Sequence, residues 1–334
     1  MYMHDFGYDT HESIEWARRN SDFPVYAVAI YLIIVFYVPE HLSAPFDLRQ
    51  PWRLWNLLLA LFSICGAAHT VPHLAKTVAD RGVAYTLCEP PEDWYLVGPV
   101  GMWVSFFIFS KIPELLDTVF LVFQKKEVIF LHWFHHVTVL LYCWHAYTTN
   151  NATGLWFCAI NYSVHSVMYL YYFLSISGGA LRTYARPMAP MITTIQLAQM
   201  VVGCGVTVGS GLLSARGPCA VDPSNVRLGF TMYLSYFVLF AMLFYNLYLK
   251  KGGKHARKPR EGEAETLCGV DLNKGDASGF FHGARRPNVN DAPEGAAAPT
   301  PAPASPPAKS SPPSKRITRS ATRATKRPVG RKAD

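Results

Sequence analysis

Residues 131–145, LHWFHHVTVLLYCWH, combine the two properties that decide how this chain folds and where its chemistry lies. The stretch is largely apolar and aromatic, as in a helix that crosses a bilayer. It also carries His132, His135 and His136, whose i, i+3, i+4 spacing places all three rings on one helical face. A lone histidine in an apolar helix usually packs in the core. Three within five residues indicate either metal ligation or nucleophilic and acid–base chemistry.

The composition around this stretch is that of a membrane protein with a basic C-terminal segment. Of 334 residues, 50% are hydrophobic and 16% charged, and the mean hydropathy is +0.11. Residues 250–334 hold 18 of the 31 Lys and Arg but only 8 of the 23 Asp and Glu. The net charge of +8 therefore belongs to this segment and does not indicate a nucleic-acid-binding body. The first 22 residues lack the apolar core of a signal peptide.

Apolar stretches of about 20 residues predict the membrane spans. We predict an all-α membrane protein with seven transmembrane helices, the third interrupted by Pro113: 23–38, 54–75, 95–123, 132–149, 154–175, 187–210 and 228–249. Basic residues directly after the last span place the C-terminus in the cytosol and the N-terminus in the lumen. We expect a lumenal N-terminal segment (1–22), a helical body (23–250) and a disordered Pro/Ala/Ser-rich cytosolic tail (251–334). We expect the tail to contact anionic lipid. Arg331 and Lys332, near its end, resemble a dilysine-type retrieval signal for the endoplasmic reticulum.

Ionisable side chains inside spans are costly, so they are candidates for function. In KIPELLDT (111–118), Lys111, Glu114 and Thr118 share a helical face, and Asp117 lies about 60° beyond Glu114. We expect these charges to pair with each other or with a polar cavity. The alternative is an ion pair that only fixes helix packing.

Two further spans carry polar stripes. In NYSVHSVMYLYY (161–172), Asn161, His165, Met168 and Tyr172 recur on one face, and the next span adds Thr193, Gln196 and Gln199. Such residues either join helices by hydrogen bonds or line a site, and the spacing alone leaves both interpretations open.

A shared metal site is disfavoured by topology. The second histidine pair, His69 and His73, is expected near the lumenal end of its span, whereas His132 to His136 open theirs at the cytosolic face. At 1.5 Å per residue the two groups lie about 20 Å apart, too far for one ion. We expect no bound metal and keep a membrane di-iron desaturase or hydroxylase as the alternative enzyme. A receptor or a transporter is disfavoured by the clustered histidines and by the lack of internal repeats.

Four motifs together resemble a known family. KIPELLDT, LHWFHHVTVLLYCWH, NYSVHSVMYLYY and TTIQLAQ (193–199) stand in the order and spacing of the very-long-chain fatty acid elongases, the ELO family of 3-ketoacyl-CoA synthases. The resemblance covers about residues 23–250. Trp133 and Glu127 are similar to the branch that acts on saturated and monounsaturated long-chain acyl-CoAs.

The resemblance implies a fold and a reaction. Six of the seven helices would enclose an acyl-chain tunnel closed at the lumenal end, with lumenal Cys88 and Cys219 joined by a disulfide. The enzyme would join an acyl-CoA and malonyl-CoA to give 3-ketoacyl-CoA, CO2 and CoA, with no bound cofactor. Expected partners are these substrates, membrane lipid and the other enzymes of the elongation cycle in the endoplasmic reticulum. A homodimer is left open, and no nucleic acid is expected.

The resemblance also suggests roles for individual residues. His135 would accept the acyl group with His165 as its partner, while His132 and His136 orient groups or donate protons. Asn161 would hold an imidazole tautomer, and Lys111, Glu114 and Asp117 would organise the mouth of the tunnel. The expected substrate-binding residues are Lys125, Lys126, Met168, Tyr169, Tyr172, Gln196 and Gln199. Arg182 and Arg186 are either CoA contacts or positive-inside residues, Cys143 and Cys158 are core, and the Asn151 sequon is expected to be unmodified.

Overall fold

The computed structural model describes residues 8–250, 266–267 and 270–271, and every long element in these ranges is a helix. In the first half of the chain the helices are α1 (Thr10–Arg19), α2 (Phe23–Phe36), α3 (Val38–His41), α4 (Arg49–Arg81), α5 (Val83–Cys88), η1 (Pro91–Asp93), α6 (Gly98–Ser110), η2 (Pro113–Leu115) and α7 (Leu116–Phe123). The second half contains α8 (Phe130–Thr148), α9 (Gly154–Ser177), α10 (Gly179–Ala185), η3 (Arg186–Met188), α11 (Ala189–Ser214), α12 (Pro223–Phe244) and the π-helical turn η4 (Tyr245–Leu249).

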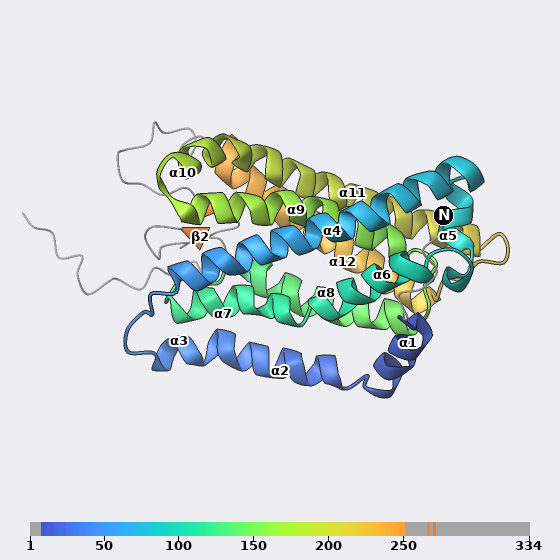
Figure 1. The fold of residues 1–334 in the computed structure, drawn as a ribbon, viewed down its shortest axis with the longest axis horizontal. Helices are drawn as coiled ribbons and strands as arrows, with labels where there is room; N and C mark the ends of the chain where they lie inside the picture. The colour runs from blue at the N-terminus through green and yellow to red at the C-terminus, as the bar shows by residue number, and fades with distance from the viewer. Residues whose placement is uncertain (1–7, 251–265, 268–269, 272–334) are drawn as a thin grey trace, which may run out of the picture. The chain divides into compact units, whose positions relative to one another are not determined.

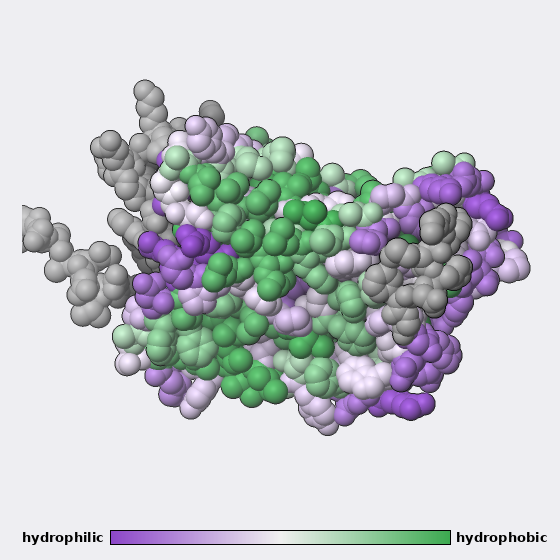
Figure 2. All heavy atoms as spheres, viewed as in Figure 1, coloured by the Kyte–Doolittle hydropathy of each residue, from purple (hydrophilic) through white to green (hydrophobic). Residues whose placement is uncertain are grey.

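Apolar helices make the chain a multi-pass membrane protein. Within the described ranges, four helical stretches are long and apolar enough to cross a bilayer: Phe23–His41, Arg49–Arg81, Gly179–Ser214 and Pro223–Leu249. The helices α8 and α9 have 19 and 24 residues but fall outside this group, because histidines and other polar residues lower their hydropathy. Figure 2 shows an apolar band over the middle of the visible face, with hydrophilic residues gathered toward both ends.

The expected third span is two helices rather than one. Helix α6 ends at Ser110, the 3₁₀ turn η2 covers Pro113–Leu115, and α7 starts at Leu116. The break follows from Pro113, which lacks a backbone N–H and whose ring clashes with the preceding turn. At this turn the side chains of Lys111 and Glu114 form an ion pair.

Six helical segments form a closed circuit of contacts. Helix α4 packs on α9, α9 on α11, α11 on α12, α12 on α8, α8 on α6, and α6 returns to α4. Helix α2 lies outside this circuit, against α7 and α8 (Figure 1). We call the end that carries Cys88 and Cys219 the disulfide end, and the end where α4 begins and α12 finishes the tail end.

The N-terminal segment contains a helix that its polar sequence did not reveal. Helix α1 packs on α6 and α8 and buries Ile14 and Ala17. Asp9 caps its first turn by accepting hydrogen bonds from two backbone N–H groups. Arg18 Nε donates to the carbonyl of Thr148 at 2.8 Å. An amphipathic helix with one narrow apolar stripe reads as a polar segment when only its composition is considered.

The structure also describes the residues of the expected sequon and a short part of the expected tail. Asn151 and Thr153 of the sequon are 1% and 3% exposed, which leaves no room for a glycan. In the expected tail, the structure describes only β1 (Thr266–Leu267) and β2 (Val270–Asp271), which pair antiparallel. The rest of that tail, including the expected retrieval signal, and residues 1–7 lie outside the described residues.

Candidate active site

A cavity lies among the helices of this circuit. Its walls come from α4, α7, α8, α9, α11 and α12. It brings together eleven of the residues expected from the sequence: Asp117, His132, His135, His136, Asn161, His165, Met168, Tyr169, Tyr172, Gln196 and Gln199. The polar stripes of three separate spans therefore face one space.

The three histidines of α8 face this cavity from one helical face. Their ring centroids are 4.7 Å apart for His132 and His136, and 5.7 Å apart for His135 and His136. This clustering is the direct result of the i, i+3, i+4 spacing at the start of α8.

His132 is held by a relay from two other helices. Its Nε2 lies 2.8 Å from the Thr118 hydroxyl on α7, and Thr118 lies 2.9 Å from the Tyr31 hydroxyl on α2. Thr118 shares the helical face read from KIPELLDT, whereas nothing in the sequence pointed to Tyr31. Helix α2, although outside the circuit, therefore reaches the site through one hydroxyl.

His165 is oriented by its own helix neighbour. Asn161 Nδ2 lies 3.1 Å from His165 Nε2, and the ammonium group of Lys111 donates to Asn161 Oδ1 at 3.4 Å. An ammonium group can only donate, so the amide oxygen faces Lys111 and the amide N–H faces the imidazole. His165 Nε2 is then the acceptor, and the proton of the neutral ring lies on Nδ1.

Lys111 and Glu114 form a buried ion pair behind the cavity wall. Lys111 Nζ lies 2.7 and 2.8 Å from the two carboxylate oxygens of Glu114, and Ser110 Oγ donates to one of them at 2.8 Å. The ammonium group also lies 4.2 Å above the ring of Phe107. Neither charged residue lines the cavity.

Asp117 is separated from that pair and does line the cavity. Its two carboxylate oxygens accept hydrogen bonds of 2.7 Å from Trp55 Nε1 and from the Tyr169 hydroxyl. The carboxylate thus joins α7 to α4 and α9. Tyr169 is one of the residues expected to bind substrate, and in the structure its hydroxyl donates to Asp117.

His135 is distinguished from the other histidines by its position and its contacts. It lines the large cavity and also a second, smaller one, and the two spaces share His135, Asn161, Gln199 and Met200. Its Nδ1 is buried without a hydrogen-bond partner among the described residues. The Tyr236 ring lies 4.8 Å from the imidazole, and the Tyr236 hydroxyl bonds Thr138 at 2.5 Å. No pattern in the sequence singles out Tyr236.

The expected CoA contacts lie at the tail end. Lys126 Nζ sits 4.2 Å above the ring of Trp52, which lines the cavity, and Lys125 adopts a left-handed backbone with φ of 53°. Arg182 and Arg186 are half-buried on α10 and η3, and the structure does not place them in the cavity wall. At the α9–α11 wall, Gln196 Nε2 donates to Met168 Sδ at 3.3 Å.

The second histidine pair is engaged elsewhere. His69 Nδ1 and His73 Nε2 each donate to a backbone carbonyl at 2.8 Å, and the rings stack on Trp103 and Trp94. Neither lines the cavity. In the described part of the chain, no group of three or more His, Cys, Asp or Glu side chains is arranged to hold a metal ion.

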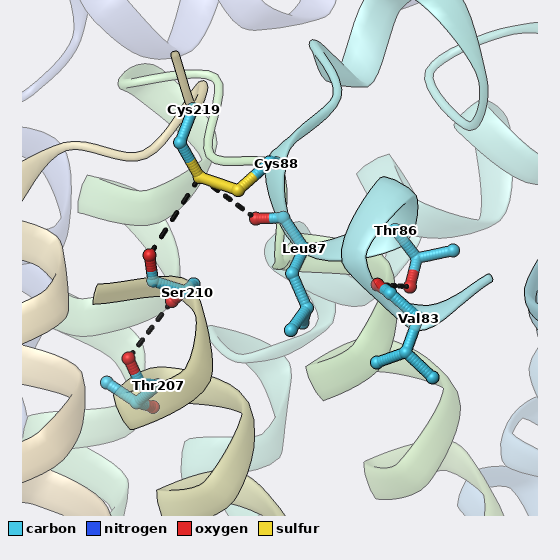
Figure 3. Close-up of a disulfide and its surroundings, with 7 residues drawn as sticks. All are labelled: Val83, Thr86, Leu87, Cys88, Thr207, Ser210 and Cys219. Atoms are coloured by element: carbon cyan, nitrogen blue, oxygen red, sulfur yellow. Dashed lines mark hydrogen bonds between the residues drawn. A yellow bond between two sulfur atoms is a disulfide. The ribbon is translucent and has the colours of Figure 1, made fainter. Parts of the chain in front are cut away.

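Cys88 and Cys219 are joined by a disulfide, as the resemblance implies (Figure 3). It links the end of α5 to the loop between α11 and α12, across 131 residues of sequence. Ala220 N donates to the Cys88 carbonyl at 2.8 Å beside it. The Cys219 sulfur lies 3.6 Å from the Leu87 carbonyl, which is a contact and not a hydrogen bond because a disulfide sulfur carries no proton.

Known proteins of similar sequence identify the family to which this chain belongs. Residues 16–256 match the family described as ELO: GNS1/SUR4 family. The chain is 49% identical over 238 residues to "Very long chain fatty acid elongase 4" of Trypanosoma cruzi (strain CL Brener), covering 70% of this chain and 82% of that protein. It is 40% identical over 261 residues to "Very long chain fatty acid elongase 6" of Gallus gallus, covering 77% and 96%. It is 40% identical over 267 residues to the Drosophila melanogaster protein of the same name, covering 77% and 82%. This chain therefore belongs to the ELO family.

Proposed function

We propose that this protein is the condensing enzyme of fatty acid elongation, which joins a long-chain acyl-CoA to malonyl-CoA and releases 3-ketoacyl-CoA, CO2 and CoA. The observation that carries the proposal is the position of His135 at the junction of two cavities. The condensation needs a held acyl chain and a second thioester on either side of one reactive group. Relatives named fatty acid elongases support the same reaction.

His135 suits the role of acyl acceptor. His132 and His165 each have Nε2 engaged by a side chain, whereas Nδ1 of His135 is buried without a hydrogen-bond partner among the described residues. Its free lone pair attacks the thioester carbonyl, a C–N bond forms and the C–S bond breaks. The CoA thiolate takes the proton released from the ring, which leaves an acyl-imidazole.

The second half-reaction uses the larger cavity. Malonyl-CoA loses CO2, the electron pair of the broken C–C bond forms an enolate, and its carbon attacks the acyl carbonyl. The C–N bond to His135 breaks and the imidazole regains a proton, so each turnover consumes one proton. His165 carries its proton on Nδ1, and with His132 and His136 it supplies N–H groups that can donate to the enolate oxygen or to the leaving imidazole.

The membrane arrangement follows from two independent features. Lys250 and the basic residues after it favour a cytosolic tail end, and a disulfide favours an oxidising lumen at the opposite end. We propose seven spans, with α6 and α7 sharing one, and six of them enclosing the cavities as an acyl tunnel. This topology fits a protein of the endoplasmic reticulum membrane. We propose the other enzymes of the elongation cycle as its partners, and no bound cofactor. Lys125 and Lys126 lie at the cytosolic end and can meet CoA phosphates.

The test is malonyl-CoA-dependent elongation by the purified protein in detergent, with a panel of acyl-CoAs that differ in length and unsaturation. We expect 3-ketoacyl-CoA from wild type and none above background from His135→Ala. We also expect saturated and monounsaturated substrates to be preferred, as Trp133 and Glu127 suggest. Incubation with acyl-CoA alone should release CoA and leave the acyl mass on the peptide that contains His135. Near-normal elongation by His135→Ala would overturn the assignment.

A further inference from the structure

Helix α2 packs against the outside of the circuit through an apolar stripe that contains one buried hydroxyl. The buried residues of this helix recur at helical spacing, and they are Pro24, Val28, Tyr31 and Val35. Tyr31 is 2% exposed, whereas the other tyrosine of this helix, Tyr26, is 62% exposed. Burying a hydroxyl is costly unless it forms a hydrogen bond, so the partner of Tyr31 decides what its hydroxyl does.

The Tyr31 hydroxyl begins a chain of hydrogen bonds that ends at the site. Within the described part of the chain it has one hydrogen-bond partner, the hydroxyl of Thr118 on α7, at 2.9 Å. Thr118 is fully buried, and its hydroxyl lies 2.8 Å from His132 Nε2. Neither Tyr31 nor Thr118 lines a cavity, whereas His132 lines the larger one. The two hydroxyls, which we call the relay, therefore reach a bound substrate only through His132.

The number of protons gives the relay a direction. Each hydroxyl has one proton to donate, and a neutral imidazole has one N–H group. If His132 Nε2 donated to Thr118, the two hydroxyls would share only one hydrogen bond, and one of their protons would have no acceptor. If Tyr31 donates to Thr118 and Thr118 donates to Nε2, both protons are used. The second arrangement is favoured because an unpaired buried donor costs more than a single hydrogen bond contributes.

This direction makes His132 similar to His165. Nε2 of His165 accepts a hydrogen bond from Asn161, so its ring proton lies on Nδ1. When Thr118 donates to His132 Nε2, the proton of the His132 ring also lies on Nδ1. That N–H is then the one donor that the neutral His132 ring can offer to a molecule in the larger cavity.

We propose that Tyr31 is a positioning residue for the condensation step. Through Thr118 it keeps the ring proton of His132 on Nδ1, so that His132 donates an N–H to the enolate oxygen formed from malonyl-CoA. The proposal rests on the proposed function, which assigns the second half-reaction to the larger cavity. Loading of the acyl group needs a lone pair on His135 and not this N–H. The relay should therefore affect condensation and leave loading unchanged.

Tyr31→Phe tests the relay, because it removes one oxygen atom and keeps the ring whose centroid lies 6.2 Å from that of His136. Without its donor, Thr118 can accept from His132 Nε2 as well as donate to it, so the ring proton loses its fixed place. In single turnovers of purified full-length protein in detergent, condensation of the acylated enzyme with malonyl-CoA should slow about 10-fold, a part of what a positioned acid–base group contributes. CoA release from a saturated acyl-CoA alone should match wild type.

Substitutions of Thr118 test whether the two hydroxyls act as one chain. Thr118→Val replaces the hydroxyl with a methyl group and should slow condensation at least as much as Tyr31→Phe does. Adding Tyr31→Phe to Thr118→Val should cause no further loss, because the relay is already broken. Thr118→Ser keeps a hydroxyl and should recover most of the lost rate. An equal loss from Tyr31→Phe with and without the Thr118 hydroxyl would show that the two act independently and would overturn the relay.

The position of the ring proton can also be measured without turnover. In protein enriched with the NMR-active nitrogen isotope in histidine, a protonated ring nitrogen is distinguished from an unprotonated one. The signals lost in His132→Gln assign the ring. Wild type should show the proton on Nδ1 only, and Tyr31→Phe should show both tautomers. A proton on Nε2 in wild type contradicts the proposal whatever the kinetics.

Tyr147→Phe is the matched control. Tyr147 is a buried tyrosine of α8 whose hydroxyl lies 2.7 Å from that of Ser105 and 2.5 Å from that of Ser13, and it lines neither cavity. Tyr147→Phe also removes a bonded hydroxyl, but it should keep wild-type rates in both half-reactions.

Two kinetic results would overturn the role of Tyr31 alone. One is a folded Tyr31→Phe variant with wild-type condensation, and the other is a variant in which CoA release slows by the same factor as condensation. Wild-type protein that forms no 3-ketoacyl-CoA would instead contradict the proposed function. The NMR measurement would still report the ring proton of His132 in that case, so the two failures are distinguishable.

Discussion

Four histidines line one cavity, but their surroundings differ and so do the roles that they can take. Thr118 contacts His132 Nε2, Asn161 donates to His165 Nε2, and His135 Nδ1 is buried without a hydrogen-bond partner among the described residues. Of the four, only His135 also lines the smaller cavity. At the scale of the residue, these differences in contacts and position support His135 as the acyl acceptor proposed above.

Asn161 links the buried Lys111 to the imidazole of His165, so its loss should disturb the proton position on that ring. We expect Asn161→Ala to lower kcat about 10²-fold with KM for malonyl-CoA little changed, in the range that positioned acid–base groups contribute. Steady-state kinetics of the purified variant checks this. Asn246→Ala is the control, because Asn246 bonds only a backbone carbonyl on the exposed end of α12. Wild-type kinetics from Asn161→Ala would refute the link.

At the scale of the element, the buried ion pair lies at the helix break that contains Pro113. Lys111 and Glu114 would also share a face in a continuous helix. In this structure Glu114 lies in η2, and the Lys111 ammonium group donates to both of its carboxylate oxygens. A pair buried this deeply is stable only while both charges are present.

Lys111→Met should leave the Glu114 carboxylate buried without its partner and destabilise the protein by about 3–5 kcal/mol. The double variant Lys111→Met, Glu114→Gln removes both charges and should recover most of that loss. Thermal unfolding in detergent measures the difference as a shift in midpoint. Equal midpoints for the single and double variants would show that the two charges do not depend on each other.

The disulfide is the second element-scale feature, because it ties α5 to the loop before α12 across 131 residues of sequence. Cys88→Ser should destabilise the protein by about 2–4 kcal/mol, a typical effect of removing a link that closes a long loop. Dithiothreitol should lower the unfolding midpoint of wild type and leave that of Cys88→Ser unchanged. Cys204→Ser, at a free half-buried cysteine, should respond to the reductant as wild type does.

At the scale of the whole molecule, the circuit of six helical segments encloses the cavities and fixes which end each one faces. The larger cavity involves Trp52 and the start of α8 at the tail end, and the smaller one leads toward the disulfide end. CoA substrates present in the cytosol can reach the larger cavity from the tail end only if that end faces the cytosol, as proposed above.

In sealed microsomes, we therefore expect protease to remove a C-terminal epitope without detergent. A membrane-impermeant reductant should leave the Cys88–Cys219 disulfide intact until the membrane is opened. Gel mobility and epitope blotting report both results. An epitope protected in intact vesicles would reverse the proposed orientation and move the expected CoA site to the other side.

The sequence by itself determined most of the architecture and much of the site. Apolar runs fixed the helical membrane body, and helical spacing placed the histidines of α8 and the stripe of α9 on single faces. These patterns are local, because the period of one helix depends only on its own residues. The position of the break at Pro113 could also be predicted, although the helices on its two sides were predicted as one span. The polar composition of residues 10–19 hid α1, since its packing stripe is narrow.

The contacts between helices were decided only by the tertiary structure. The rotation of each helix and the identity of its neighbour depend on packing over the whole molecule, which no single helix encodes. Only the fold therefore shows that Tyr31 supports Thr118, that Tyr236 covers His135, and that Asp117 bonds Trp55 instead of Lys111.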